Sequence, residues 1–150
     1  MIKYFVIISF IIAISKYDQI WKLRYAESVN ATTVIGSSIL DVPALELADV
    51  LQLLQMRKGL FIDVRNRANY NKEHIKGAYW VDTSQISAMP EGIISIIKNY
   101  DVVIIYCETN SCQSQYSAGV AFQSLGFENN YIYTGGFLEW KACGLPVESQ

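Results

Sequence analysis

Blocks of apolar positions recur along residues 38–148 and switch repeatedly between two patterns. Short continuous apolar runs bounded by turn residues predict strands at residues 39–42, 60–64, 78–81, 102–106 and 131–133. Apolar residues three or four positions apart, or short polar stretches between strands, predict helices or helical turns at residues 45–54, 66–72, 84–89, 91–98, 114–125 and 137–143. Pro43 is expected in the first turn of the first helix.

The arrangement of these segments predicts the fold class. Every position of the run 102–106 is apolar, which is typical of a strand that is buried on both faces of a parallel sheet. Strands that alternate with helices indicate an α/β fold, with a mainly parallel central sheet flanked by helices.

The N-terminal segment follows a different pattern. Residues 4–14 form eleven positions without a charge, with Lys3 before them and Lys16 soon after. This run is shorter than the roughly 17–20 apolar residues that cross a membrane, and it ends in small residues, as a secretory signal does. We expect residues 1–15 to be a signal peptide or a short membrane anchor. A buried N-terminal element of the fold is the alternative.

The remaining chain divides into two parts. Residues 16–37 are polar and mixed, which indicates a linker, and residues 38–148 carry the alternating pattern of a single domain. An N-terminal signal predicts an exported protein, periplasmic or otherwise extracytoplasmic, with a possible membrane tether through residues 1–15. Cysteines then meet an oxidising compartment.

Composition narrows the function classes. The 150 residues are 51% hydrophobic, which excludes disorder over most of the chain. Twelve basic and fourteen acidic residues give a net charge of −2, which argues against a nucleic-acid partner. The three cysteines and single histidine show no zinc-type spacing, so we expect no metal and no cofactor.

Cys107 is the main candidate for chemistry. It directly follows the apolar strand, and a helix is expected to begin near Gln113. Ligands of open α/β sheets bind at the carboxyl ends of strands, and a helix N-terminus stabilises a thiolate. Cys107 is therefore a candidate nucleophile with an electropositive cradle. The alternative is that it is a small buried hydrophobic residue.

Four stretches of sequence, in order, carry a family resemblance. They are residues 61–65 (FIDVR) with Tyr70 and residues 73–78 (EHIKGA), residues 103–107, residues 118–127 with a Leu-Gly-Phe end, and residues 131–146 with Gly135-Gly136 and Trp140. Over residues 38–148 the chain resembles the rhodanese (sulfurtransferase) domain.

The resemblance implies a role for each matched residue. Cys107 takes sulfur from a small sulfur-containing anion or persulfide donor such as thiosulfate, holds it as a persulfide, and passes it to a thiol or another nucleophile. The backbone of the following loop cradles the anion: Glu108, Thr109, Asn110, Ser111, Cys112 and Gln113. Structural roles are implied for Asp63, Arg65, His74, Gly77, Gly135, Gly136 and Trp140. We expect Asp63 and Arg65 to anchor loops through hydrogen bonds and an ion pair, and Gly135-Gly136 to permit a tight turn from strand to helix.

The loop departs from the family pattern in its charge. Many active rhodaneses carry basic residues there, whereas residues 107–113 contain no lysine or arginine and Glu108 adds a negative charge. An oxyanion donor loses an ion pair in such a loop. Gln113 stands where a related phosphatase loop needs an arginine, which argues against phosphatase chemistry.

Cys112 is the second departure. It either resolves a persulfide or sulfenate on Cys107 through a disulfide, or is simply oxidised with it in an exported protein, or points into the interface between sheet and helix. The odd thiol, Cys143, is expected to be a partly buried spectator. An intermolecular disulfide is its alternative role.

Two main function classes therefore compete. The first is a sulfurtransferase that uses a Cys107 persulfide. The second is a catalytically weak rhodanese-like module that binds a partner or senses redox state through Cys107 and Cys112. A thiol–disulfide oxidoreductase is a third reading. The sequence identifies neither the acceptor nor a partner protein.

Overall fold

The computed structural model describes residues 42–109 and 111–150, which belong to one compact unit, Ile39–Gln150. The expected signal or anchor at residues 1–15 and the linker at residues 16–37 lie outside the described residues. Among the described residues, no helix has the length and apolar character needed to cross a membrane.

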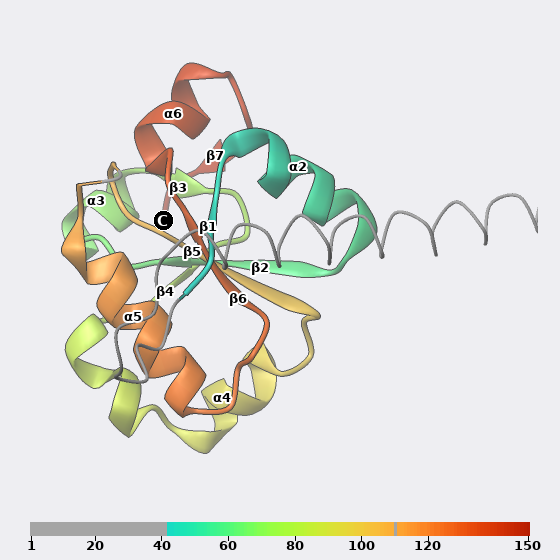
Figure 1. Ribbon diagram of the computed structural model, residues 1–150. Helices are drawn as coiled ribbons and strands as arrows, with labels where there is room; N and C mark the ends of the chain where they lie inside the picture. Colours follow the sequence, from blue (N-terminus) through green and yellow to red (C-terminus); the bar gives the residue numbers. More distant parts are fainter. Residues whose placement is uncertain (1–41, 110) are drawn as a thin grey trace, which may run out of the picture. The chain divides into compact units, whose positions relative to one another are not determined.

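A five-stranded sheet forms the centre of the domain (Figure 1). Its strands lie in the order β1-β6-β5-β2-β4, and each neighbouring pair is parallel. The strands are β1 (Ala44–Leu45), β2 (Gly59–Asp63), β4 (Tyr79–Trp80), β5 (Val102–Tyr106) and β6 (Asn130–Tyr133). The predicted α/β fold with a mainly parallel central sheet is therefore confirmed.

Helices cover both faces of this sheet (Figure 1). On one face lie the 3-10 helix η1 (Thr83–Ala88), α4 (Glu91–Ile97) and α5 (Gln113–Ser124). On the other face lie α2 (Leu47–Met56) and α6 (Gly136–Ala142), and α3 (Arg67–Lys72) follows β2. Asn66 begins α3 by accepting a hydrogen bond from the Asn69 N–H through its side chain, as a polar N-cap does.

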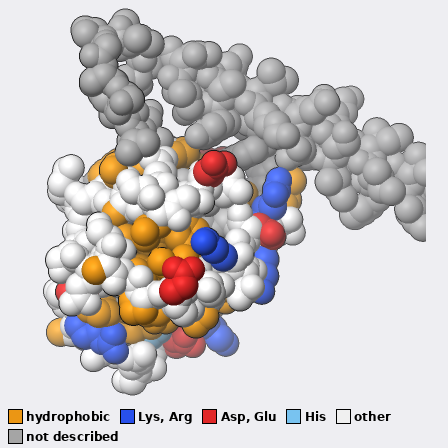
Figure 2. Space-filling view, turned by 90° about the horizontal axis from the view of Figure 1, so that it is seen from below, with side chains coloured by type: hydrophobic (Ala, Val, Ile, Leu, Met, Phe, Trp, Pro, Cys, Tyr) orange, Lys and Arg blue, Asp and Glu red, His pale blue; other side chains and the backbone are white. Residues whose placement is uncertain are grey.

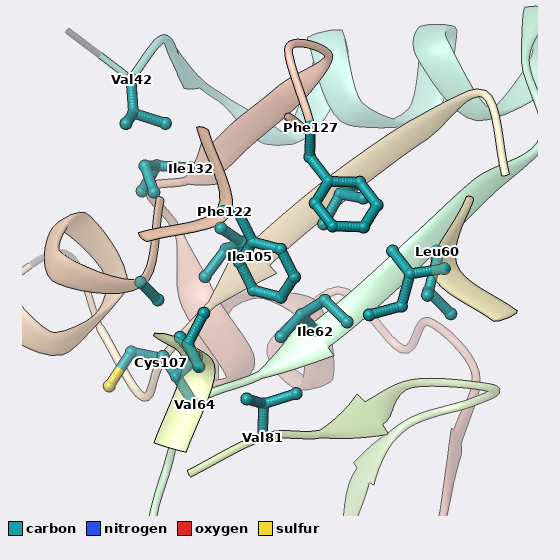
Figure 3. Close-up of a cluster of buried hydrophobic side chains, with 14 of the residues drawn as sticks. Val42, Leu60, Ile62, Val64, Val81, Ile105, Cys107, Phe122, Phe127 and Ile132 are labelled. Atoms are coloured by element: carbon teal, nitrogen blue, oxygen red, sulfur yellow. The ribbon is translucent and has the colours of Figure 1, made fainter. Parts of the chain in front are cut away.

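Alternation along the central strands sends successive side chains to opposite faces of the sheet. On the α5 face, aliphatic side chains of β2 and β5 join Phe122 and Phe127 in one buried cluster (Figure 3). On the α6 face, Phe61 packs edge-on against Trp140, with ring centroids 5.0 Å apart. Both faces of β5 are covered, which explains why this strand has an apolar residue at each position.

A second, two-stranded antiparallel sheet was not predicted. It pairs β3 (His74–Ile75) with β7 (Val147–Glu148). Strands of two residues are too short to produce a periodic pattern in the sequence. Their pairing brings the C-terminal end of the domain against the segment that follows α3.

Two local predictions are wrong. Pro43 lies before β1 and not in the first turn of a helix, because the chain first pairs Ala44 and Leu45 with β6. Cys143 is exposed and not partly buried, because it follows the last residue of α6 at the surface. The strand predicted at residues 39–42 lies mostly outside the described residues, and its described residue, Val42, precedes β1 without belonging to a strand. The remaining predicted strands and helices agree with the structure to within a few residues.

The face of the domain seen from below carries few charged side chains (Figure 2). In the space-filling view from below, apolar side chains reach the surface between small groups of acidic and basic residues (Figure 2). This agrees with the charged fraction of 17%.

Candidate active site

Cys107 lies where the sequence predicts it, directly after β5 at the carboxyl end of the central sheet. Its side chain points to the α5 face and sits at the rim of the apolar cluster, near Val64 (Figure 3). Only 4% of the residue is exposed. Strand β5 has a hydrogen-bonded neighbour on each side, so the position of Cys107 is fixed by the centre of the sheet.

Cys107 is joined to Cys112 by a disulfide. The two residues are five positions apart, and their Cα atoms are 6.1 Å apart. Cys112 is the N-cap residue of α5, and its Sγ lies 3.1 Å from the hydroxyl of Ser114. The loop therefore places both thiols together at the N-terminus of a twelve-residue helix.

The backbone around Cys107 is fixed from the opposite side by the start of α6. The Phe137 N–H donates to the carbonyl of Cys107 at 2.9 Å, and the Leu138 N–H donates to that of Glu108 at 3.2 Å. Gly136 makes this approach possible, since its φ is +66° and a Cβ there would lie 2.7 Å from the Glu108 carbonyl oxygen. The predicted turn at Gly135-Gly136 thus also holds the loop.

Residues 107–113 contain no basic residue, but Arg65 from elsewhere in the chain brings a positive charge to the loop. It follows β2, and its Nη1 donates to Oε2 of Glu108 at 3.0 Å. Its other nitrogens bind the Asp63 carboxylate and the Glu73 carbonyl, and its guanidinium lies 4.0 Å from the centre of the Phe137 ring. One buried side chain therefore connects β2, the end of α3, the loop and α6.

The charges in this cluster are almost balanced. Burial disfavours the charged form of Arg65, but hydrogen bonds and charge attraction from Asp63 and Glu108 outweigh it and raise the pKa of the guanidinium. Two carboxylates against one guanidinium leave a net charge of −1 at neutral pH. The predicted Asp63–Arg65 ion pair is present, at 2.8 Å.

Tyr106 extends this network beneath the loop. Its hydroxyl donates to Asp63 at 2.6 Å and accepts from the Ile75 N–H at 3.1 Å. Burial and the neighbouring Asp63 charge raise the pKa of Tyr106 well above its ordinary value. Asp63 is completely buried, so these partners satisfy a carboxylate that water cannot reach.

The other described residues of the predicted cradle lie in the same loop or at the start of α5. Thr109 and Ser111 share a hydrogen bond of 2.9 Å between their hydroxyls. The Cys112 N–H donates to the Thr109 carbonyl, and Gln113 begins α5 with an exposed side chain. Asn110 lies outside the described residues.

Three of the residues predicted to be structural, His74, Gly77 and Trp140, have hydrogen-bond partners outside the active loop. His74 is buried, stacks on Tyr70, and donates from Nδ1 to the Tyr70 carbonyl at 2.8 Å. Gly77 has a φ of +78° and donates its N–H to Glu148 at 2.8 Å. Trp140 is core, and its Nε1 donates to the Pro146 carbonyl.

A separate open hollow of about 380 Å³ lies beyond β1 and β6 and is lined by Glu46, Leu47, Ala48, Thr134, Gly135 and Glu139. Its two glutamates make it unsuitable for an anion, and it does not include Cys107. Among residues 42–109 and 111–150, no group of three or more His, Cys, Asp or Glu side chains could hold a metal ion.

Sequence reasoning missed the contact between Arg65 and Glu108. The two residues are 43 positions apart, and only the pairing of β2 with β5 brings their strand ends together. The predicted parallel sheet could have indicated this contact, because the carboxyl ends of neighbouring parallel strands lie at the same edge of the sheet.

Comparisons with known proteins agree with this architecture. The model of the rhodanese-like domain family matches residues 46–143. A thiosulfate sulfurtransferase, GlpE of Tolumonas auensis, is 30% identical over 91 residues, which cover 59% of this chain and 78% of that protein. The solution structure of the rhodanese-like domain of Anabaena Alr3790 is 26% identical with a TM-score of 0.58, over 73% of this chain and 81% of that one.

A longer relative also matches. The protein slr1261 of Synechocystis is 32% identical over 101 residues, which cover 64% of this chain. The match spans half of the length of slr1261. Because the family model covers more than half of the sequence and the fold agrees with it, the chain belongs to the rhodanese-like domain family.

Proposed function

We propose that the protein is a rhodanese-type sulfurtransferase in which Cys107 carries sulfane sulfur as a persulfide. The position of Cys107 carries this proposal, since it lies at the carboxyl end of a central parallel strand and on a loop that leads into the N-terminus of α5. The similarity to a protein named thiosulfate sulfurtransferase supports the same chemistry.

The reaction begins with the Cys107 thiolate, so the disulfide must first be reduced. The thiolate attacks the outer sulfur of thiosulfate, the sulfur–sulfur bond of the donor breaks, and sulfite leaves with the electron pair. Cys107 then holds one extra sulfur as a persulfide. A thiol or another nucleophile removes that sulfur and returns the Cys107 thiolate.

Two features of the site favour negative charge at Cys107. The N-terminal end of α5 carries backbone N–H groups and the positive end of the helix dipole. Arg65 neutralises Glu108, the acidic residue next to the nucleophile. Since Arg65 also binds Asp63, it has little charge left for a dianion, and we expect weak affinity for thiosulfate.

Mass analysis of the full-length chain tests the proposal. The Cys112→Ser variant is incubated with thiosulfate after reduction, and we expect a gain of one sulfur atom on Cys107. Cys107→Ser in the same background is the negative control, and Cys143→Ser is the matched control for an unrelated exposed thiol. No gain with either thiosulfate or glutathione persulfide overturns the proposal.

The disulfide favours a second candidate function. A rhodanese-like module that senses redox state or binds a partner needs the Cys107–Cys112 pair but no sulfur transfer. In that case partner binding differs between the oxidised and reduced protein, and the mass experiment detects no gain of sulfur on Cys107. The family match favours the sulfurtransferase.

We also propose export, through a signal peptide or anchor at residues 1–15. The apolar run between Lys3 and Lys16 supports this location. Cleavage after Ser15 gives a secreted chain whose mass corresponds to a start at Lys16. A chain recovered from the membrane at full mass indicates the anchor, and full-length protein in the cytoplasm contradicts both.

A further inference from the structure

The sulfur atoms of Cys107 and Cys112 meet within one loop, and this contact goes beyond what sulfur transfer to an outside acceptor requires. A persulfide on Cys107 places its inner sulfur, Sγ, where the disulfide now holds it. Cys112 reaches that atom, since it is bonded to it in the oxidised structure. Cys112 is therefore in position to attack the persulfide before any outside thiol does.

We propose that Cys112 is a catalytic resolving thiol, so that the protein releases the transferred sulfur as hydrogen sulfide and is then reduced by an external dithiol. This inference rests on the proposed sulfurtransferase function and names the acceptor within that site. If the inference holds, the disulfide is an intermediate of the reaction and not a permanent structural cross-link.

The chemistry of the resolving step balances. The Cys112 thiolate attacks Sγ of Cys107, a new bond forms between the two cysteine sulfurs, and the bond to the outer sulfur breaks. The outer sulfur leaves with the electron pair as HS⁻, carrying the persulfide proton. Two cysteine thiols have been oxidised to a disulfide, and the sulfane sulfur has been reduced to sulfide.

The surroundings of Cys112 suit it to this attack. It is the N-cap residue of α5, where the helix dipole stabilises a thiolate. The hydroxyl of Ser114, 3.1 Å from its Sγ, is placed to donate a hydrogen bond to that thiolate. These contacts supply the nucleophile without a lysine, arginine or histidine in the loop.

Differences in exposure predict how the disulfide is reduced. Cys107 is buried, whereas Cys112 is only partly buried where it packs against the apolar cluster. An external dithiol therefore attacks Cys112, forms a mixed disulfide with it, and releases Cys107 as the leaving thiolate. The second thiol of the reductant then frees Cys112, which returns the site to the state that accepts the next donor.

The buried position of Cys107 also explains why an internal acceptor is useful. A bulky outside thiol has little access to a sulfur with 4% exposure at the edge of an apolar cluster. Cys112 reaches the same sulfur from within the loop. A small dithiol or the exposed dithiol of a reductase protein then needs to contact only Cys112, the less buried cysteine.

A single-turnover experiment without added thiol tests the inference. The full-length chain is reduced, freed of reductant, and mixed with excess thiosulfate, and sulfide and sulfite are measured together with the protein mass. We expect the unmodified protein to release one sulfide per chain and to end as the Cys107–Cys112 disulfide. Cys112→Ser releases sulfite alone and keeps the persulfide, and Cys143→Ser behaves as the unmodified protein.

Different outcomes separate the two proposals. If Cys112→Ser gains no sulfur from thiosulfate and none from glutathione persulfide, the proposed sulfurtransferase function fails. If that variant and the unmodified protein both keep a persulfide for equally long and release no sulfide, sulfur transfer stands and the resolving role of Cys112 is wrong. Dithiothreitol, added as the probe dithiol, restores further turnovers in the unmodified protein if the inference holds.

Discussion

At the scale of single residues, the polar groups behind the loop matter as much as the thiol. Tyr106 satisfies both the buried Asp63 carboxylate and the Ile75 N–H. Replacing it with phenylalanine leaves both of these buried groups without that partner. We expect Tyr106→Phe to lower the free energy of unfolding by about 1–3 kcal/mol, measured by urea denaturation at neutral pH. Tyr116→Phe, at an exposed position of α5, is the control and changes little.

The same tyrosine predicts a dependence of stability on alkaline pH. In the unfolded chain Tyr106 ionises at about pH 10, whereas burial and Asp63 keep it protonated in the folded protein to higher pH. The folded state then binds more protons than the unfolded state, so the free energy of unfolding falls as pH rises above about 10. Tyr106→Phe makes this fall shallower in urea denaturations between pH 8 and 11. Equal slopes for variant and unmodified protein contradict the prediction.

Glu108 contributes to the charge that the proposed sulfur donor would meet at the loop. It binds Arg65 at 3.0 Å, but the cluster with Asp63 still carries one net negative charge. We expect Glu108→Gln to lower the KM for thiosulfate severalfold, since removal of one partly exposed charge near a dianion is worth about 1 kcal/mol. Glu128→Gln, at an exposed loop position, is the matched control. A fall in kcat with unchanged KM contradicts this reading, because it indicates that Glu108 serves mainly to position the loop.

Some features of the site can be predicted from the sequence, and one contact cannot. Cys107 followed from its place after a continuous apolar strand, and the Asp63–Arg65 pair followed from the family motif. The partner of Glu108 did not follow, because a contact over 43 positions depends on the register of β2 against β5. The loop sequence contains no arginine, but in the folded domain Arg65 contacts the loop through Glu108.

At the scale of elements, the start of α6 holds the active loop in place through backbone hydrogen bonds. Phe137 and Leu138 donate backbone hydrogen bonds to the first two loop carbonyls, and Gly136 lets the two segments approach. A helix start and a loop about thirty residues apart in sequence are therefore joined by hydrogen bonds. We expect the proposed sulfur transfer at Cys107 to depend on that support, because small shifts of a reacting atom slow a reaction strongly.

Gly136→Ala tests this support. Its Cβ would lie 2.7 Å from the Glu108 carbonyl oxygen and 2.8 Å from that of Cys107, so the loop must move. We expect the rate of persulfide formation to fall by at least tenfold. Gly144→Ala is the matched control, since Gly144 has a similar φ of +68° but open space around its Cβ position.

The two substitutions share the conformational cost of a left-handed residue and differ in the clash with the loop. A comparable loss of rate in both variants attributes the effect to general destabilisation and contradicts the proposed support. Urea denaturation of both proteins provides the stability readout that this comparison needs.

Element types were predictable where they had enough length to show a period. Strand β5 and helices α4 and α5 agree closely with the expected ranges. The pair β3 and β7 was missed because two residues carry no periodicity, and Pro43 was misplaced because β1 is equally short. These short strands exist only through pairing with distant residues, which a local pattern cannot encode.

At the scale of the described domain, the two faces of the sheet have separate tasks. The α5 face carries both loop cysteines and the main apolar cluster. The α6 face carries Arg65, Tyr106 and the aromatic contacts that fix the loop backbone. Alternation along β2 and β5 assigns these groups, since successive side chains point to opposite faces. The reactive sulfur and its support therefore come from neighbouring positions of the same strands.

This division predicts that the fold does not depend on the disulfide. A link between residues five positions apart constrains only a short loop, worth about 2 kcal/mol in the unfolded-chain entropy model. A domain of this size typically has 5–15 kcal/mol of stability, and the core on both faces of the sheet does not need the link. Reduction should therefore lower the free energy of unfolding by no more than about 2 kcal/mol, measured by urea denaturation with and without reductant.

The double variant Cys107→Ser, Cys112→Ser is the control for this measurement, since its stability should not respond to reductant. A reduced protein that unfolds in buffer would mean that the disulfide is a structural staple, because a resting site that must open in each turnover cannot also hold the domain together. A folded, only slightly weakened reduced state is what a reversible dithiol requires. The stability of the reduced domain thus decides whether the Cys107–Cys112 pair is free to take part in a reaction cycle.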